Sequence, residues 1–161
     1  MKKKMAFISI LCLLFLTTTT VIAADLKDLD RVSVLMPKSQ VLSILGKPGK
    51  MVEMDKSLQV DLYDLENMDP LVVAGYIYGN ENSLGGHALI LRGNVANPAA
   101  ERLRTHGFTL LEQTGKGEGA SWRLAGRDDD TGQPVVVTIV QDNGLTIVMT
   151  FEKEFYDRHQ K

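Results

Sequence analysis

The sequence predicts an α+β fold in which two short-helix-plus-antiparallel-strand units pack as one compact domain. Two short segments with helical periodicity each begin near a proline and end at a glycine. Each segment is followed by several short runs rich in Val, Ile, Leu and Tyr, which is typical of strands. Near the end of the chain, Asp142-Asn143-Gly144 joins two such runs, and Asn-Gly in this position indicates a type I′ hairpin.

The N-terminus has the three-part pattern of a secretory signal peptide. Lys2, Lys3 and Lys4 precede an apolar segment over residues 5–16, and small residues before Ala24 suit cleavage after Ala23. The apolar segment is shorter than the roughly 20 residues that a membrane-spanning helix needs. We therefore expect residues 1–23 to be removed and residues 24–161 to form a single mature domain. The alternative is an uncleaved N-terminal anchor.

Composition limits the kinds of partner. Cys12 is the only cysteine and lies inside the apolar segment after Leu11, so lipid attachment there and disulfides in the mature chain are both excluded. Loss of three lysines with residues 1–23 changes the formal net charge from −2 to −5, since 15 Lys and Arg then face 20 Asp and Glu. This acidic balance argues against a general affinity for nucleic acid or anionic lipid.

The first unit is predicted to begin with a helix of about nine residues. Pro37 suits the first helical position, an apolar stripe follows over residues 41–45, and Gly46 and Pro48 end the helix. Strands are predicted over residues 51–54, 58–62, 71–78 and 87–91, the second of them half-buried because its apolar residues alternate with polar ones. Residues 79–86 are predicted to be a loop.

The second unit repeats this plan. Asn97 is predicted as the N-cap and Pro98 as the first residue of a helix that reaches about His106 and stops at Gly107. Strands are predicted over residues 108–112, from Trp122 onward, and over 135–141 and 145–151. Flexible or polar turns are predicted over residues 115–119 and 128–132.

The Asn-Gly turn also sets the register of the last hairpin. One side of the sheet should pair Val140 with Ile147, Thr138 with Met149 and Val136 with Phe151, and the other should pair Ile139 with Val148 and Val137 with Thr150. We expect the first side to pack against a helix and the second, semi-apolar side to be left uncovered.

Residues in and at the ends of the two predicted helices recur at an offset of 61 residues. Pro37 and Pro98, Leu42 and Leu103, and Gly46 and Gly107 correspond. Subdomains over residues 24–93 and 94–161 would follow from a tandem repeat, but unrelated helices share such residues, so the repeat stays a hypothesis.

Residues 36–48 resemble the SmpA/OmlA family of outer-membrane assembly lipoproteins, a group that also includes the β-lactamase-inhibitor-protein-like (BLIP-like) fold. The matching positions are Met36, Lys38, Val41, Ile44, Leu45, Gly46 and Pro48. Leu35 and Pro37 depart from the family's usual Gly and Ser/Thr, and the lipid-bearing cysteine is missing. The resemblance covers about 13 residues of the chain. It implies a helix-plus-sheet module, at most a BLIP-like tandem, that works by binding other proteins and supplies no catalytic residue.

No residue pattern predicts a catalytic, cofactor or metal site. The aspartates of residues 128–132 are consecutive and lack a closing Glu, so a solvated turn is favoured over a calcium loop. His87, His106 and His159 are too far apart in sequence for a local zinc site, and His106 suits a helix C-terminus. No serine lies in a nucleophile-elbow motif.

Six residues are candidates for binding a partner through the side of the sheet that we expect to be uncovered. Aromatic residues are enriched where proteins contact one another, and aliphatic neighbours would extend such a surface. The candidates are Trp122, Tyr76, Tyr78, Val137, Ile139 and Val148.

These observations favour an exported, non-enzymatic protein of the cell envelope that binds another envelope or secreted protein. The periplasm is the expected compartment, with the extracellular space as an alternative. Two other functions stay open. A small-ligand carrier would have an apolar cavity with converging polar groups between helix and sheet. A hydrolase would have a cleft in which a His lies beside a carboxylate or hydroxyl.

Overall fold

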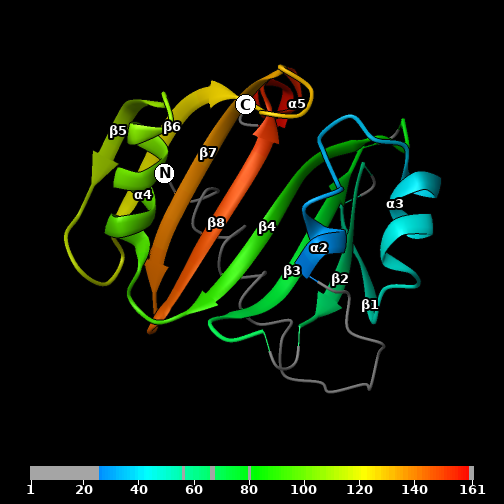
Figure 1. The fold of residues 1–161 in the computed structure, drawn as a ribbon, viewed down its shortest axis with the longest axis horizontal. Helices are drawn as coiled ribbons and strands as arrows, with labels where there is room; N and C mark the ends of the chain where they lie inside the picture. Colours follow the sequence, from blue (N-terminus) through cyan, green and yellow to red (C-terminus); the bar gives the residue numbers. More distant parts are fainter. Residues whose placement is uncertain (1–25, 56, 66–67, 80, 160–161) are drawn as a thin grey trace.

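The computed structural model describes residues 26–159 apart from residues 56, 66–67 and 80 (Figure 1). The predicted signal peptide, its cleavage site and Cys12 lie outside the described residues. Within the described part, one antiparallel sheet carries a few short helices, so the predicted α+β class is confirmed. None of the described helices has the length and apolar character needed to cross a membrane.

The chain builds the sheet in two successive halves. The first half consists of α2 (Leu26–Leu29), α3 (Lys38–Leu45), β1 (Lys50–Asp55), β2 (Leu58–Asp64), β3 (Leu71–Tyr78) and β4 (Leu84–Arg92). The second half consists of α4 (Ala96–Thr105), β5 (Thr109–Thr114), β6 (Ser121–Arg127), β7 (Pro134–Asp142), β8 (Leu145–Glu152) and α5 (Lys153–His159). The sequence did not predict α2 or α5.

The strand order is β1-β2-β3-β4-β8-β7-β6-β5. Each half is therefore a four-stranded meander, and the last strands of the two halves, β4 and β8, pair at the centre of the sheet (Figure 1). Helices α2 and α3 lie over the first half and α4 lies over the second half, on the same face. Helix α5 packs on the opposite face through Phe155.

The hairpin between β7 and β8 has the predicted turn and register. Asn143 and Gly144 are the two turn residues, and both have the positive φ angles, 51° and 72°, that a type I′ turn requires. All five cross-strand pairs expected from this turn are present in the sheet. A two-residue turn thus fixed the relative position of two long strands.

Helix α3 lies where predicted, but Pro37 is its N-cap and not its first residue, and α4 begins earlier than expected. Gly46, with φ 76°, ends α3. Helix α4 begins at Ala96, so the prediction of Asn97 as N-cap and Pro98 as first residue is wrong. The backbone N–H of Val95 donates to Thr146 Oγ1 over 3.0 Å, and this bond to β8 fixes the chain just before the helix.

Two strand predictions need correction. Residues 84–86 belong to β4 rather than to a loop, because two aromatic rings pack closely on the glycines of this segment. In β2 the polar face is not open to solvent, since Asp61 and Tyr63 are 0% and 1% exposed. Helix α3 covers this face and supplies Lys38, whose Nζ lies 2.9 Å from both carboxylate oxygens of Asp61.

The expectation of an uncovered sheet face beside Ile139 is also wrong. Helix α4 packs on that face, and its Ala96 and Ala100 join Ile139 in one buried cluster. Small alanine side chains let the helix approach the strands closely. The side that we expected to pack a helix lies on the opposite face, where Ile147, Met149 and Phe151 join Phe155 of α5.

Candidate functional site

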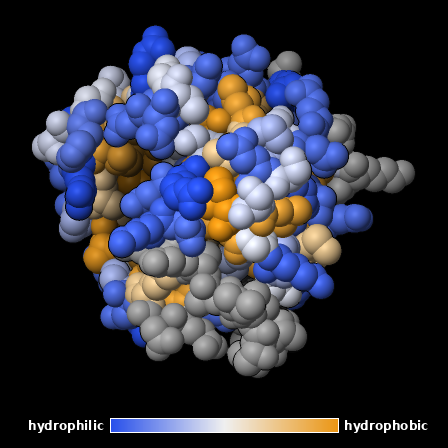
Figure 2. All heavy atoms as spheres, turned by 45° about the vertical axis from the view of Figure 1, so that its right-hand side comes forward, coloured by the Kyte–Doolittle hydropathy of each residue, from blue (hydrophilic) through white to orange (hydrophobic). Residues whose placement is uncertain are grey.

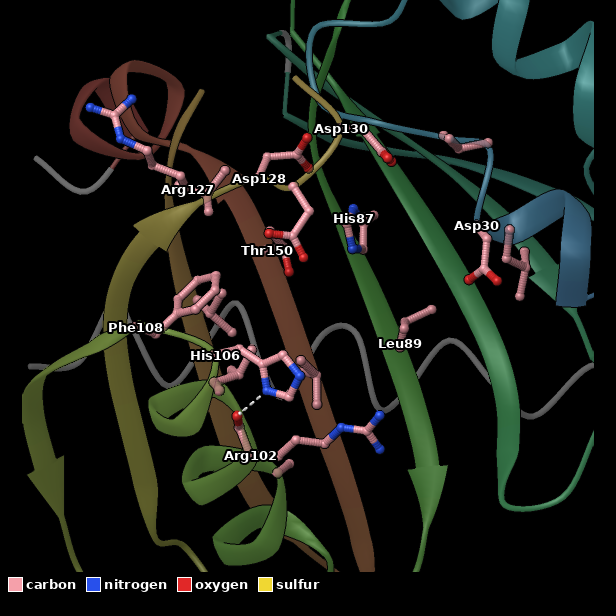
Figure 3. A pocket seen from close by; sticks show the side chains of 18 of the residues that line it. Asp30, His87, Leu89, Arg102, His106, Phe108, Arg127, Asp128, Asp130 and Thr150 are labelled. Carbon is pink, nitrogen blue, oxygen red and sulfur yellow. Dashed lines mark hydrogen bonds between the residues drawn. The ribbon is translucent and has the colours of Figure 1, made fainter. Parts of the chain in front are cut away.

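A cleft of about 600 Å³ lies on the face of the sheet that carries α2, α3 and α4. It forms because α2 and α3 cover one half of the sheet and α4 covers the other, which leaves the central strands β4 and β8 between them (Figures 1 and 3). In the space-filling view a hollow with hydrophobic atoms inside is bordered by hydrophilic residues (Figure 2). Both halves of the chain contribute to its lining.

The floor and inner walls of the cleft are largely apolar. Strands β4, β7 and β8 supply the floor, α4 and the segment after it supply one wall, and the α2 segment supplies the other. These apolar residues are Leu29, Val32, Leu71, Leu89, Ala99, Leu103, Phe108, Val135, Val137 and Val148. Phe108 can lie against the sheet because Gly126 has no side chain: a Cβ there would lie 2.4 Å from the ring.

Three polar side chains cross the middle of this floor in one row. His87 on β4 pairs with Tyr76 on β3 and with Thr150 on β8, and the apolar Val137 on β7 is the next residue of the row. Direct cross-strand partners point to the same face of a sheet, so these residues reach the cleft together. Sheet pairing thus brings together residues from positions 76 to 150 of the chain.

His87 is the most unusual member of the row. Its Nδ1 is buried and has no hydrogen-bond partner among the described residues, although the side chain as a whole keeps some contact with solvent. Burial lowers the pKa of His87 to about 4, against the smaller opposing effect of the nearby Asp128 charge. The imidazole is therefore neutral near pH 7 and has both one donor and one acceptor nitrogen to offer.

Tyr76 supplies a second polar side chain to the lining of the cleft. Its side chain is only 2% exposed. Burial, then the neighbouring Tyr63 and Asp30, raises the pKa of Tyr76 well above its usual range, so the hydroxyl keeps its proton. Tyr63 packs edge-on against Tyr76 with ring centroids 5.6 Å apart and fixes its orientation.

Basic side chains border the cleft on the α4 side. The Nδ1 of His106 lies 2.7 Å from the carbonyl oxygen of Arg102, and since a carbonyl only accepts, Nδ1 carries the proton. The Nε2 of a neutral His106 is then an acceptor. The Arg102 guanidinium points from α4 toward the floor near Leu89 (Figure 3). In the described residues it has no ion-pair or hydrogen-bond partner.

Acidic side chains border the cleft on the other side. They are Asp30, directly after α2, and Asp128, Asp129 and Asp130 in the turn between β6 and β7. Asp128 Oδ1 accepts hydrogen bonds from the backbone N–H and the hydroxyl of Thr131, each over 2.8 Å, which shapes the turn. Asp130 Oδ2 accepts a hydrogen bond from Ser33 over 3.1 Å, so this turn is tied to the first half of the chain and is not simply solvated. In the residues that the structure describes, no three His, Cys, Asp or Glu side chains are grouped as metal ligands.

The structure divides the six predicted partner-binding residues between three environments. Tyr76, Val137 and Val148 line the cleft. Trp122 and Ile139 lie beneath α4 and are 8% and 0% exposed. Tyr78 is buried with the α3 cluster, where Lys38 Nζ lies 4.7 Å from its ring centroid.

Sequence reasoning did not connect the polar residues of the cleft. His87 carried one local signal, because it is a polar residue on the same strand face as Leu89 and Leu91, in an otherwise apolar run. Its position opposite Thr150 depends on the pairing of β4 with β8, which no local pattern indicates. Comparison of the chain with protein-family models, with curated proteins and with solved structures gives no match.

Proposed function

We propose that this protein is a non-enzymatic carrier or sensor that binds a small amphipathic molecule in the cleft between α4, α2 and strands β4 and β8. The observation that carries this proposal is an apolar floor interrupted by a buried, unsatisfied polar atom, His87 Nδ1, with Tyr76 on the neighbouring strand. A volume of about 600 Å³ lies in the range of small-molecule sites, which are mostly apolar with a few converging polar groups.

Unsatisfied groups of this kind favour occupancy. A buried donor or acceptor without a partner destabilises a protein by about 1–3 kcal/mol, and a ligand that supplies the partner recovers part of that free energy. The hydrolase alternative is less well supported. It requires a His held by a carboxylate or hydroxyl, and His87 has neither as a hydrogen-bond partner in the described residues.

Fluorescence titration of the purified protein with the uncharged probe N-phenyl-1-naphthylamine tests the proposal. Ala99 lines the cleft from α4, so Ala99→Trp should fill the space and weaken probe binding at least roughly tenfold. Leu111→Trp is the matched control, because Leu111 is 53% exposed on β5 and lies outside the cleft lining. Equal probe affinity in both variants would remove the cleft as the binding site.

Binding of another envelope protein is a second candidate function, and Leu35 is the observation that favours it. This leucine is 46% exposed and has a φ of 68°, a left-handed conformation that costs about 1–2 kcal/mol for a residue with a Cβ. Hydrogen bonds of 2.8 Å from Leu35 N to Leu84 O and from Leu84 N to Met36 O hold the segment in place. Strain that presents an apolar side chain to solvent is typical of a contact point. The resemblance of residues 36–48 to SmpA/OmlA proteins agrees with this role.

A photo-crosslinking residue tests this second candidate in cells. Placed at position 35, it should give one discrete adduct that the same residue at position 111 does not give. Position 111 is a suitable comparison because Leu111, at 53%, is at least as exposed as Leu35. Adducts that are identical at the two positions would indicate nonspecific contact.

We propose further that the domain acts in the periplasm after loss of residues 1–23, and that its halves derive from one repeated, BLIP-like unit. The support for a repeat is the strand order, in which each half places a helix before a four-stranded meander and ends at the centre of the sheet. N-terminal sequencing of the native protein from a periplasmic extract tests the export proposal, which expects a start at Ala24. A start at Met1 in the cytosolic fraction would contradict it.

A further inference from the structure

The polar side chains at the two sides of the cleft differ. Arg102 and His106 lie on the α4 side, whereas Asp30, Asp128 and Asp130 lie on the opposite side, where Arg127 also lies near Asp128, and His87 lies between the two groups (Figure 3). The first group comes from α4 and the residue after it, and the second comes from the segment after α2 and the turn between β6 and β7, so the fold keeps the two groups apart.

The key charges of both groups are free to bind a ligand. The Arg102 guanidinium and the Asp30 carboxylate, both on solvent-exposed residues, have no ion-pair or hydrogen-bond partner in the residues that the structure describes. The neighbouring acids can accept further hydrogen bonds, since Asp128 and Asp130 each use one carboxylate oxygen, toward Thr131 and Ser33. By contrast, Arg104, on the same helix as Arg102, is paired with Glu101 over 2.8 Å.

A ligand of a single charge sign fits this arrangement poorly. A fatty acid could pair with Arg102, but its charge would enter a cleft whose four aspartates outnumber its two arginines, Arg102 and Arg127. A simple amine could pair with Asp30 but would leave the exposed Arg102 guanidinium to solvent. A molecule with an ammonium at one end and a carboxylate at the other satisfies both groups.

We infer that the ligand is a zwitterion with an apolar side chain, of the class of short apolar peptides with free termini. This inference rests on the proposed function of the cleft. The ligand's carboxylate accepts hydrogen bonds from the Arg102 fork, and its ammonium lies at Asp30 and Asp128 beside the Tyr76 hydroxyl. Its apolar side chain covers Leu89 and Val148, and its peptide group lies across His87, which can both donate and accept.

Calorimetric titration with a small set of leucine peptides tests this inference. Leu-Leu or Leu-Leu-Leu should bind, and blocking either the amino or the carboxyl terminus should weaken binding at least roughly tenfold. Arg102→Gln should abolish the difference between the free acid and its amide. Arg104→Gln, which removes an equal charge from the same helix outside the cleft, should preserve that difference.

The acidic side has its own variants. Asp30→Asn should abolish the difference between free and N-acetylated peptide, whereas Asp28→Asn, at a residue that pairs with Arg31 and does not line the cleft, should preserve it. If the naphthylamine probe or decanoate binds and no peptide does, the inferred ligand class is wrong while the cleft remains a binding site. If neither the probe nor any peptide binds, the proposed function itself is wrong. Peptide binding that is indifferent to both blocking groups also overturns the inferred class.

Discussion

The Ser33 hydroxyl donates a hydrogen bond to Asp130 Oδ2 over 3.1 Å, and this bond joins the two halves of the chain at the cleft. Ser33 follows α2 in the first half, and Asp130 belongs to the turn between β6 and β7 in the second half. Residues on both sides of the bond line the cleft, including Val32 and Asp128. The bond therefore ties the segment after α2 to the turn between β6 and β7 along the acidic side of the cleft.

Removal of this bond should speed the release of a bound probe from the cleft while lowering the free energy of unfolding only slightly. We expect Ser33→Ala to lower the free energy of unfolding by about 1 kcal/mol, since a hydrogen bond contributes about that much, and to speed release of the bound naphthylamine probe. Ser43→Ala is the control, because the Ser43 hydroxyl bonds only to Gln40 O within the exposed face of α3. Urea unfolding and stopped-flow fluorescence measure the two quantities. Unchanged release kinetics in Ser33→Ala would show that the bond does not control access.

The pKa of His87 predicts a dependence of stability on pH. In the unfolded chain His87 has a pKa near 6.5, and in the folded protein burial lowers it to about 4. Between these values the unfolded state binds more protons, so the free energy of unfolding rises with pH over this range. His87 should therefore weaken the fold as the pH falls from 6.5 to 4, by an amount on the order of 3 kcal/mol.

The variant His87→Gln isolates this contribution, because glutamine keeps polar atoms on the cleft floor but does not titrate. The measurement is urea unfolding of both proteins at pH 4.5 and pH 7.5. The difference in unfolding free energy between the two pH values should be smaller in the variant, since other titrating groups contribute equally to both proteins. An identical pH dependence would show that His87 is protonated in the fold as readily as in the unfolded chain.

Local signals predicted the parts of this fold that local interactions determine. The Asn143-Gly144 turn predicted a register that the structure confirms, because a two-residue turn leaves the facing strands only one alignment. The sequence did not predict helix α5, because the residue that accepts hydrogen bonds from its first N–H groups is not of a usual N-cap type. Glu152 accepts bonds from Glu154 N and Phe155 N over 2.9 and 2.7 Å, whereas Ser, Thr, Asp and Asn are the usual caps.

The cleft depends on contacts that no local pattern indicates. His87 and Thr150 become neighbours only when β4 pairs with β8, and these strands are separated by an entire half of the chain. The hairpin pattern established that Val137 and Thr150 share a face but gave no sign of which face α4 would cover. In the structure, Ala96 and Ala100 pack on the side of Ile139, so α4 covers that face. The expected uncovered face was therefore wrong, and whether the six candidate residues bind a partner stays a prediction.

Lys38 and Asp61 form the buried ion pair whose loss should destabilise the fold most clearly. Asp61 is 0% exposed and Lys38 only 16%, so Lys38→Met leaves a buried carboxylate without its counter-charge. We expect a loss of about 3–5 kcal/mol in the free energy of unfolding, and recovery of much of it in Lys38→Met/Asp61→Asn. The control Lys153→Met removes an exposed pair with Asp157 and should change the free energy of unfolding much less than Lys38→Met does. Urea unfolding of the four proteins decides, and equal effects of the two lysine variants would contradict a structural role for the buried pair.

Gly85 and Phe155 form a contact that tolerates no added atom on the glycine. A Cβ at Gly85 would lie 2.1 Å from Phe155 Cδ2, whereas a Cβ at Gly79 would lie 3.1 Å from Cε2 of the same ring. Phe155 is 5% exposed and cannot move away without leaving the cluster that fixes α5 on β4. We expect Gly85→Ala to destabilise the fold by about 1–3 kcal/mol and Gly79→Ala by less. In a Phe155→Ala background, which itself costs about 3–5 kcal/mol, the added penalty of Gly85→Ala should nearly vanish because the clashing ring is gone. Thermal unfolding of the double-mutant cycle measures this coupling, and additive effects of the two substitutions would place the Gly85 penalty elsewhere than at the ring.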